Sequence, residues 1–323
     1  MRMPLTQLFN VPTWLPSQRF CRQSTAIIDQ PALLQPRSRK LQSNPSAASV
    51  STSMDTASTD TASNTASLDE VSWVEPPALV GSSLRILNWN IAKNNHDLAW
   101  YRDFTTLLRT HRPHLVFLQE VRLCAQRRHL PALTELAWSF APNFLDTYHQ
   151  TYSGVLTAGV VQCTRRQSIL TDHHEPIAKT PKVALCTEYA IAPSGDQPTH
   201  SRPDRLLTVN AHLINFVELK KFQAQLDTLE QRMADHDGLI VFSGDFNTWS
   251  RSRWHCLQRM TQRLGLTQAV FPSWDTGQIK RFLLSPPLDY VFYRGFHQTT
   301  TTAKVIGSIT SSDHKPLLLE LTC

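Results

Sequence analysis

The chain has 323 residues, enough for one large domain or two ordinary ones. It carries 32 Lys and Arg against 26 Asp and Glu, and the whole net charge of +6 lies in residues 84–323. This excess suits a phosphate-bearing partner such as nucleic acid or an anionic lipid headgroup, and it suits ordinary surface charge equally well. Six scattered cysteines without a C-x-x-C pair argue against a disulfide scaffold and a cysteine zinc site.

Residues 1–80 are predicted to be a disordered tail and linker. The stretch 41–70 is rich in Ser, Thr, Ala and Asp and has too few large apolar side chains to offset the entropy of ordering. The N-terminus lacks the apolar core of a secretory signal, and no apolar run approaches the roughly 20 residues that span a bilayer. We therefore expect a cytoplasmic protein. An organellar location is the alternative if residues 1–53 are a transit peptide, and a true start at Met54 explains the composition as well.

From residue 84 onward, short apolar runs typical of strands alternate with helical patterns. A first helix is marked by Tyr101, Phe104 and Leu108 and stops at Arg112. A second runs from Leu219 to Met233, and a third contains Trp254, Leu257 and Met260. The predicted strands are 84–90, 115–119, 154–161, 183–191, 206–213, 239–242, 288–293, 302–306 and 317–321. About nine strands with a few helices between them predict two packed sheets with helices outside, in one domain over residues 81–323.

Polar side chains fall at the ends of many of these apolar strands. One alone would be a turn former or a cap. Six such positions in one chain favour a site built on one rim of a rigid scaffold, because charged groups beside a core are costly unless they pair or bind a cation. These side chains are Asn90, Glu120, Asn210 with His212, Asp245 with Asn247, Asp289, and Asp313 with His314.

These residue types suit metal-assisted cleavage of a phosphoester. Mg²⁺ prefers carboxylate and amide oxygens, which Asn90, Glu120 and one of Asp245 or Asp313 can supply. The reaction also needs a positioned water and relief of charge on the phosphoryl oxygens. A histidine beside a metal site can act as a base towards the water or stabilise the charge if a carboxylate orients its ring. Asp289 is the candidate to orient His314, and Asn247 and His212 are candidates to bond the phosphate.

At these positions the chain resembles the endonuclease/exonuclease/phosphatase superfamily, which includes pancreatic-type deoxyribonucleases, abasic-site endonucleases, neutral sphingomyelinases and inositol polyphosphate phosphatases. The resemblance spans about residues 84–323 and implies a four-layer α/β/β/α sandwich of two mixed sheets with helices outside, an α+β fold. Each matching piece is short, and their order along the chain makes them specific together. They are N-W-N-I at 88–91, L-Q-E at 118–120, V-N-A-H-L at 209–213, G-D-F-N at 244–247, L-D-Y at 288–290 and S-D-H at 312–314.

The resemblance also implies a role for each residue. Glu120 resembles the principal Mg²⁺ ligand, with Mn²⁺ as an alternative ion; Asn90 lies beside it, and Asp313 resembles an acid on the metal side. Asp245 and Asn247 resemble the pair that positions the attacking water and holds the phosphate. His314, oriented by Asp289, resembles the histidine that acts on the water or on the scissile phosphate, and His212 takes a place on the leaving-group side. Which residue is the general base stays open.

The substrate is less well determined. The motif after G-D-F-N departs from those of inositol phosphatases and abasic-site enzymes, and the chain looks closest to a bacterial branch with G-D-F-N-x-W-S-R and P-L-D-[YF]-V-F-Y-R-G. A nuclease is the first hypothesis, because Arg251, Arg253 and Trp254 follow the motif closely and could grip a phosphate backbone; solvated helix faces and a core tryptophan are the bland reading. We predict Lys93, Asn215 and Arg251 as substrate-binding residues.

Two alternatives remain beside the nuclease. The first is a phosphatase or phosphodiesterase acting on a small molecule or a lipid headgroup. The second is a binding protein that keeps the fold without the chemistry, against which the full set of polar residues argues. The sequence leaves the oligomeric state open.

Overall fold

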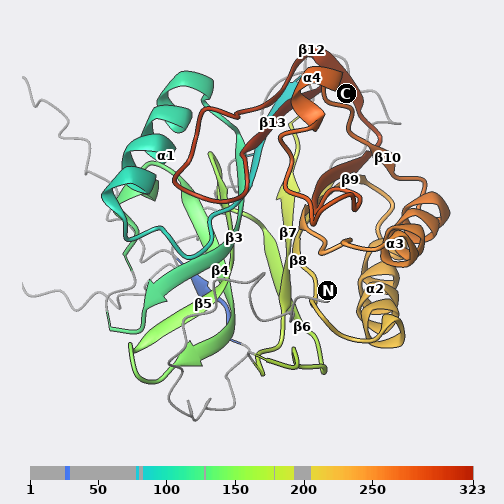
Figure 1. Ribbon diagram of the computed structural model, residues 1–323. Helices are drawn as coiled ribbons and strands as arrows, with labels where there is room; N and C mark the ends of the chain where they lie inside the picture. Colours follow the sequence, from blue (N-terminus) through green and yellow to red (C-terminus); the bar gives the residue numbers. More distant parts are fainter. Residues whose placement is uncertain are drawn as a thin grey trace, which may run out of the picture. The chain divides into compact units, whose positions relative to one another are not determined.

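The computed structural model describes residues 26–29, 78–79, 83–126, 129–177, 179–192 and 205–322. Thirteen strands among them form two mixed sheets, which Figure 1 shows between α1 on one side and α2 and α3 on the other. The order in the seven-stranded sheet is β1 (Ile28–Asp29), β4 (Ala137–Asp146), β5 (Thr151–Gly159), β3 (Leu115–Cys124), β2 (Ser83–Asn90), β13 (Leu317–Thr322) and β12 (His297–Val305).

The second sheet has six strands. Its order is β10 (Thr267–Gln268), β11 (Asp289–Arg294), β9 (Leu239–Asp245), β8 (Arg205–His212), β7 (Val183–Ala190) and β6 (Arg165–Leu170). The helices are α1 (Leu98–His111), α2 (Leu219–Ala234), α3 (Arg251–Arg263) and the short α4 (Ser273–Thr276), with a 3₁₀ turn at Pro131–Leu133. None of the helices in the described part of the chain is long and apolar enough to cross a bilayer.

The apolar core is divided by the sheets into layers. One cluster lies between the sheets and joins Ile86 and Phe117 of the first sheet to Val241 of the second. A second cluster packs α2 and α3 onto the outer face of the six-stranded sheet, and a third packs α1 onto the outer face of the seven-stranded sheet through Phe104. The four-layer α/β/β/α sandwich predicted from the sequence is therefore confirmed.

One parallel pair of strands in each sheet prepares the site. β2 is parallel to β3, and β8 is parallel to β9, whereas every other pairing of named strands is antiparallel among the described residues. Parallel neighbours end at the same edge of a sheet. The polar residues that end these strands are thereby brought to common rims.

The structure corrects the sequence prediction at four strands. β1, β4, β6 and β10 were not predicted. The segment of β4 contains Pro142 and Asn143, which interrupt a strand pattern, and a register shift accommodates them opposite β5. β6 begins with two arginines and lies at the edge of its sheet, where exposed charge is common. Arg165 and Arg166 are thus the first two residues of a strand.

Two helix faces also differ from the predicted ones. Tyr101 and Leu219 were assigned to the buried stripes, yet their side chains are 40% and 42% exposed. In α1 the buried residues are Trp100, Phe104 and Leu107. Phe104 was predicted, whereas Trp100 and Leu107 each precede the predicted residue by one position. Tyr101 and Leu219 both lie in the first turn of their helices.

Six described residues fall within the predicted N-terminal tail. Ile28 and Asp29 form β1, which pairs with β4 opposite Phe140 and Ser139. Leu79 forms a bridge to Ile191 and is buried. At these places the chain is ordered against the folded unit, contrary to the expectation of a tail without structure. The rest of residues 1–80 lies outside the described residues.

Candidate active site

The strand ends bring the predicted polar residues together on one rim. Asn90 ends β2, His212 ends β8 and Asp245 ends β9. His212 and Asp245 are partners in the parallel pairing of β8 and β9, and Asp289, the first residue of β11, lies opposite Asp245 in the antiparallel pairing. All four side chains are buried. The sheet register itself therefore sets their spacing.

Asp245 is the carboxylate on which the site converges. Its Oδ2 accepts a hydrogen bond from Asn90 Nδ2 at 2.9 Å, and its Oδ1 accepts one from the backbone N–H of Asn247 at 3.0 Å. The Nε2 atoms of His212 and His314 lie 3.7 and 3.9 Å from Oδ2. Burial raises the pKa of Asp245, and the two imidazoles oppose that effect. A carboxylate in this position is a better proton acceptor than an exposed aspartate.

His314 is oriented by Asp289, as predicted. Its Nδ1 lies 2.7 Å from Asp289 Oδ2, and both side chains are buried. Burial lowers the pKa of His314, but the hydrogen-bonded Asp289 carboxylate raises it, as does Asp245, and the net direction is upward. We infer that His314 carries a positive charge at neutral pH and turns Nε2 towards Asp245.

The loop that carries His314 is fastened to β2. The indole Nε1 of Trp89 donates to the carbonyl of His314 at 3.0 Å. The hydroxyl of Ser312 donates to the Asn90 carbonyl at 2.7 Å and accepts from the His314 N–H at 3.2 Å. Asn94 Nδ2 holds the carbonyl of Ser311 at 2.8 Å. A loop residue is thus held as firmly as one on a strand, which a positioned imidazole requires.

Glu120 reaches the site from a bulge within β3. Its backbone has φ of 56°, and the β3–β5 register shifts between Leu118 and Val121. Burial raises the pKa of this carboxyl, but Lys93 and Lys182 nearby, with the two histidines, lower it to about 2. Oε1 lies 3.9 Å from His212 Nε2, beyond hydrogen-bonding distance. The carboxylate is therefore charged and its oxygen is not committed to the imidazole.

His212 differs from His314 in charge, because its pKa is lowered and not raised. Burial and the charge of Lys182 lower its pKa to about 4, against the effect of Asp245 and Glu120. A neutral imidazole has one N–H to donate and one nitrogen to accept. Two histidines within 4 Å of one carboxylate thus differ in charge.

Asp313 lies at the outer margin of the cluster. Its side chain is 60% exposed, its Oδ2 accepts a hydrogen bond from Lys280 Nζ at 2.7 Å, and its Oδ1 lies 4.0 Å from His314 Nε2. The sequence placed Asp313 near a metal. The structure places it beside His314 and gives it a lysine as ion-pair partner.

The three predicted substrate-binding residues have different surroundings. Lys93 follows Asn90 in a turn with φ of 65°, close enough to Glu120 to affect its pKa. Asn215 lies beyond β8, where its N–H donates to Glu175 Oε1 at 3.0 Å. Arg251 is exposed at the first residue of α3 and takes no part in the contacts of the cluster described above.

Arg253 and Trp254 are part of the fold, which removes two supports of the nucleic-acid hypothesis. The Arg253 guanidinium is buried and donates to the carbonyls of Ile214, Asn247 and Val217. It also lies over the Phe222 and Trp249 rings, at 4.5 and 4.8 Å from the centroids. Trp254 stacks on Tyr290 with centroids 4.8 Å apart. Arg253 therefore ties the G-D-F-N segment to the end of β8 and is not available to a phosphate backbone.

Sequence reasoning missed a lysine and a glutamate beside the site. Lys182 Nζ lies 3.5 Å from Glu175 Oε1, with both side chains largely buried. The charge of Lys182 also acts on Glu120 and His212. Lys182 precedes β7 directly, so a search at the N-terminal ends of strands antiparallel to β8 would have found it. Lys280 was missed as well, and no feature of its sequence segment marks it.

The donor atoms fit a hard divalent cation. Among the described residues, Asp245, Asp289 and His314 each have a candidate ligand atom, all within 4.8 Å of one another, but a charged His314 has no lone pair for a metal, so the two carboxylates are the donors of this group. The Oδ1 atom of Asp289 is buried without a hydrogen-bond partner. Glu120 adds a charged carboxylate, and Asn90 Oδ1, which accepts from the Ala92 N–H, keeps a second lone pair. Oxygen donors of this kind suit Mg²⁺ or Mn²⁺.

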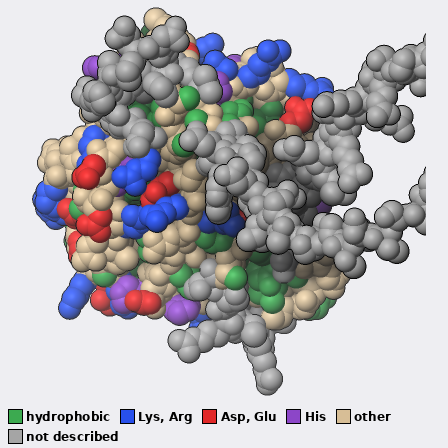
Figure 2. Space-filling view, turned by 180° about the vertical axis from the view of Figure 1, so that it is seen from behind, with side chains coloured by type: hydrophobic (Ala, Val, Ile, Leu, Met, Phe, Trp, Pro, Cys, Tyr) green, Lys and Arg blue, Asp and Glu red, His purple; other side chains and the backbone are tan. Residues whose placement is uncertain are grey.

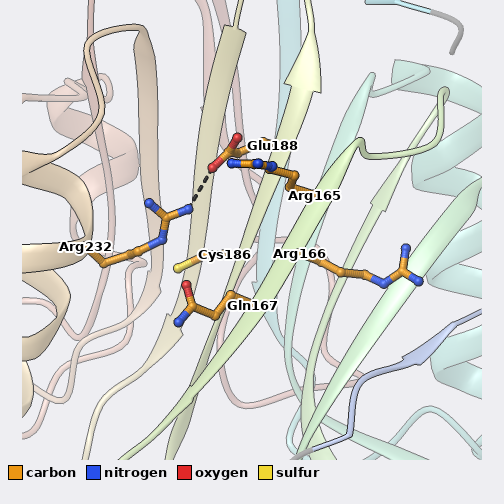
Figure 3. A pocket seen from close by; sticks show the side chains of 6 residues that line it. All are labelled: Arg165, Arg166, Gln167, Cys186, Glu188 and Arg232. Carbon is orange, nitrogen blue, oxygen red and sulfur yellow. Dashed lines mark hydrogen bonds and ion pairs between the residues drawn. The ribbon is translucent and has the colours of Figure 1, made fainter. Parts of the chain in front are cut away.

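A surface pocket of about 440 Å³ lies elsewhere and takes no part in this site. Figure 3 shows Arg232 reaching from α2 to Glu188 on β7, and their ion pair measures 2.7 Å. Glu188 is paired with Leu207, five residues before His212 on β8 and so roughly 17 Å along the strand. In the view from behind, Lys and Arg are interspersed with Asp and Glu, which agrees with ordinary surface charge on that face (Figure 2).

The fold and the rim define a class of protein. Two mixed sheets between helices carry a buried Asp–His pair, a converging aspartate and a charged glutamate at one edge, which are the residue types that metal-assisted hydrolysis of a phosphoester needs. The sequence profile of the Endonuclease/Exonuclease/phosphatase family matches residues 87–314, and the chain belongs to this family.

Similar proteins agree with this assignment. A UPF0294 protein of Vibrio campbellii is 32% identical over 243 residues, which are 74% of this chain and 77% of that protein. An endonuclease/exonuclease/phosphatase from Beutenbergia cavernae superposes with a TM-score of 0.56 at 16% identity, over 75% of this chain and 72% of its own. A family protein from Leptotrichia buccalis gives 0.55 at 13% identity, over 74% of this chain and 100% of its own. The two structures support the fold.

Proposed function

We propose that this protein is a Mg²⁺-dependent phosphodiesterase and that nucleic acid is its first candidate substrate. Membership of the family supports a hydrolase that acts on phosphoesters. The observation that carries the proposal is the position of Asp245, which receives Asn90 and Asn247 as hydrogen-bond donors and lies within 4 Å of both His212 and His314. The arrangement supplies an acceptor for a proton beside groups that bind a phosphoryl oxygen.

Glu120, Asn90 and Asp313 are the residues proposed to hold the cation. When bound, a divalent cation supplies Lewis-acid polarisation of a phosphoryl oxygen. The low pKa of Glu120 keeps its carboxylate charged over the whole physiological range, and this charge favours cation binding. Asp313 must share its carboxylate with Lys280, whose ammonium lies at its Oδ2.

The residues of the chain then divide the remaining chemistry. Asp245 accepts the proton of the attacking water. Asn247 spends one amide hydrogen on the Leu213 carbonyl, at 2.8 Å, and keeps a second for a phosphoryl oxygen. His314, charged and held by Asp289, offsets negative charge that develops on the phosphoryl group. His212, neutral, supplies a hydrogen bond on the leaving-group side.

The nature of the substrate has two candidates. Two lysines beside Glu120, Lys93 and Lys182, support a polyanion such as nucleic acid. Arg251, exposed shortly after the G-D-F-N segment, supports the same substrate. A lipid phosphodiester is the second candidate, and one observation favours it: a run of exposed apolar side chains precedes Asp289. Nucleic acid and the lipid both contain a phosphodiester, and a hydrolysis assay with each substrate separates the two candidates.

The test is hydrolysis by the full chain of supercoiled plasmid and of phospholipid vesicles, with Mg²⁺, with Mn²⁺ or with EDTA. We expect activity that EDTA removes. Asp245→Asn keeps the size of the side chain, removes the proton acceptor and can accept only one of the hydrogen bonds from Asn90 and Asn247, so kcat should fall roughly 100-fold or more. The matched control is Asp237→Asn, an exposed aspartate before the opposite end of β9, which should leave kcat unchanged.

Nicking of the plasmid would favour nucleic acid, and release of a lipid headgroup would favour the second candidate. Activity that survives in Asp245→Asn, or in EDTA, would contradict the proposed mechanism. Failure of both substrates with both ions would overturn the proposal of a phosphodiesterase.

A further inference from the structure

A structured loop next to the site exposes an unusual run of apolar side chains. Of the exposed large hydrophobic residues in the described part of the chain, five lie within residues 270–284. Leu284 is fully exposed, and Leu283 and Trp274 are 77% and 78% exposed. Single exposed apolar residues are normal on a protein surface, whereas a cluster marks an interaction site.

The loop is held in shape by its own hydrogen bonds. Arg281 and Pro287 form a bridge at its base, and the Leu288 N–H donates to the Lys280 carbonyl at 2.9 Å. Above the base, the N–H of Ser285 donates to the Phe282 carbonyl at 3.0 Å, and the Ser285 hydroxyl accepts from the Phe282 N–H at 2.9 Å. The exposed side chains therefore do not result from a loose chain. Leu283 even takes φ of 54°, a conformation that costs a branched residue energy.

The same loop is joined to the catalytic residues at both ends. Lys280, at one end, is the ion-pair partner of Asp313. Leu288, at the other, receives the Phe246 N–H on its carbonyl at 2.7 Å and directly precedes Asp289. Whatever contacts the tip of the loop therefore lies next to the rim that carries the site.

The chemistry of the tip fits a lipid surface better than a rigid partner. A fully exposed side chain stands out from the surface, and a protruding Phe-Leu-Leu run can enter the fluid boundary between headgroups and acyl chains. Trp274 lies on α4, whose last residue, Thr276, accepts a hydrogen bond from Arg281 at 3.4 Å.

The charges at the base suit anionic headgroups. Arg281 is exposed, and among the described residues its guanidinium donates only to neutral carbonyls, those of Ser285 and Thr276, so its charge is not paired with an acid there. Lys280, in contrast, is paired with Asp313. Asp275 uses its carboxylate oxygens to accept from Gln278 and from the Val305 N–H.

We propose that the surface formed by Trp274 and Phe282–Leu284 docks on an anionic phospholipid bilayer. Inserted to the depth of these side chains, the loop places Asp289 and the rest of the rim at the level of the headgroup phosphates. Docking does not need hydrolysis. Its consequence for the substrate rests on the proposed function, and it moves the lipid phosphodiester ahead of nucleic acid.

The experiment is sedimentation of the full chain with vesicles of phosphatidylcholine alone and of phosphatidylcholine with one third phosphatidylglycerol. We expect binding to the anionic vesicles. The variant Leu283→Asp/Leu284→Asp should bind at least about 10-fold more weakly, because two apolar side chains no longer leave water. Asp accepts the left-handed conformation at position 283 more easily than Leu, so the variant should fold as well as the wild type.

The matched control is Val160→Asp. Val160 is exposed and directly follows β5. The last residue of β5 pairs with Leu115 at the start of β3, so Val160 lies at the end of the sheet opposite to Glu120. Its vesicle binding should equal that of the wild type. Asp245→Asn should also bind like the wild type, which separates docking from catalysis.

Three results would overturn the proposal. The first is a wild-type chain that stays in the supernatant with both vesicles. The second is equal binding by the wild type and the double variant. The third is light scattering that shows a dimer for the wild type and a monomer for the double variant without vesicles, since a second copy of the chain would then cover the loop. Loop-dependent binding without any diester hydrolysis would support docking and count against the proposed function alone.

Discussion

Two histidines at the same carboxylate illustrate how burial and neighbours set the role of a residue. His314 has the Asp289 carboxylate 2.7 Å from Nδ1, which raises its pKa, whereas His212 is buried near the charge of Lys182, which lowers its pKa to about 4. Both were predicted as site residues from their motifs. Their different charge states could not be predicted, because Lys182 is 30 residues from His212 in the sequence and meets it only through the pairing of β7 with β8.

Lys182 gives the prediction at this scale. Lys182→Met removes the cation that lowers the pKa of Glu120 and pairs with Glu175, while the apolar part of the side chain is kept. We expect kcat/KM to fall about 10- to 100-fold, as for loss of one charged contact. The effect should be seen in steady-state kinetics at saturating cation.

The control is Lys179→Met, which removes an exposed lysine from the same hairpin. An equal loss of kcat/KM in both variants would show that the overall charge of the hairpin matters and not the position of Lys182. A Lys182→Met enzyme with unchanged kinetics would exclude a role for this lysine in the reaction.

At the scale of the element, Gly244 decides how close β9 approaches β8. Its φ is 148°, and a Cβ there would lie 1.9 Å from the carbonyl oxygen of Ala211. His212 follows Ala211, and Asp245 follows Gly244, so the positions of these two candidate site residues depend on this approach. The glycine of G-D-F-N is thus required by the backbone of the neighbouring strand, and not by the substrate.

Gly244→Ala is therefore expected to separate β8 from β9 at the rim. The free energy of unfolding should fall by about 3 kcal/mol or more, in the range typical of strain at a special backbone position. Urea denaturation measures it. Gly277→Ala is the matched control, because a Cβ at position 277 meets no atom within 4 Å, and its stability should be unchanged or slightly higher. Equal stability of the two variants would contradict the argument.

At the scale of the whole molecule, an amide network joins the two sheets behind the site. Gln119 of β3 donates to Asn88 of β2 at 3.0 Å and to Asn210 of β8 at 2.8 Å. Asn210 in turn donates to the carbonyls of Leu118 and Leu156. These side chains are buried beside the apolar cluster between the sheets, and apolar contacts alone permit sliding. We infer that the network fixes the offset of one sheet against the other, and so the distance from Glu120 to His212.

Asn210→Ala should lower the free energy of unfolding by about 2–4 kcal/mol, because it removes the three buried hydrogen bonds that Asn210 makes with Gln119 and with the carbonyls of Leu118 and Leu156. Asn143→Ala is the comparison: Asn143 is also buried but donates a single bond, to the Pro181 carbonyl, so about 1 kcal/mol is expected. Thermal or chemical unfolding at neutral pH gives both values. A cost for Asn210→Ala no larger than for Asn143→Ala would contradict a role in joining the sheets.

Much of this arrangement could be predicted from local pattern. Apolar runs that end in Asn90, Glu120, His212 and Asp245 indicated both the strands and the rim, because a strand carries its last side chain to the edge of its sheet. The weaker strands β4 and β6 were missed, since Pro142 interrupts one and arginines open the other. A hydrophobic pattern reports burial, and the edge strand β6 is not buried enough to show one. β4 is mostly buried, but Pro142 and Asn143 break its run of apolar residues.

By itself the sequence determined the two sheets, the helices that cover them and the acids, amides and imidazoles at the strand ends, because these follow from periods of two to four residues and from motifs only a few residues long. Only the tertiary structure decided that Arg253 braces the G-D-F-N segment, that Lys182 lies beside Glu120 and that residues 281–284 stand exposed beside the site. Such contacts join residues distant in the chain. They depend on strand order and on the packing of loops, which no local pattern records.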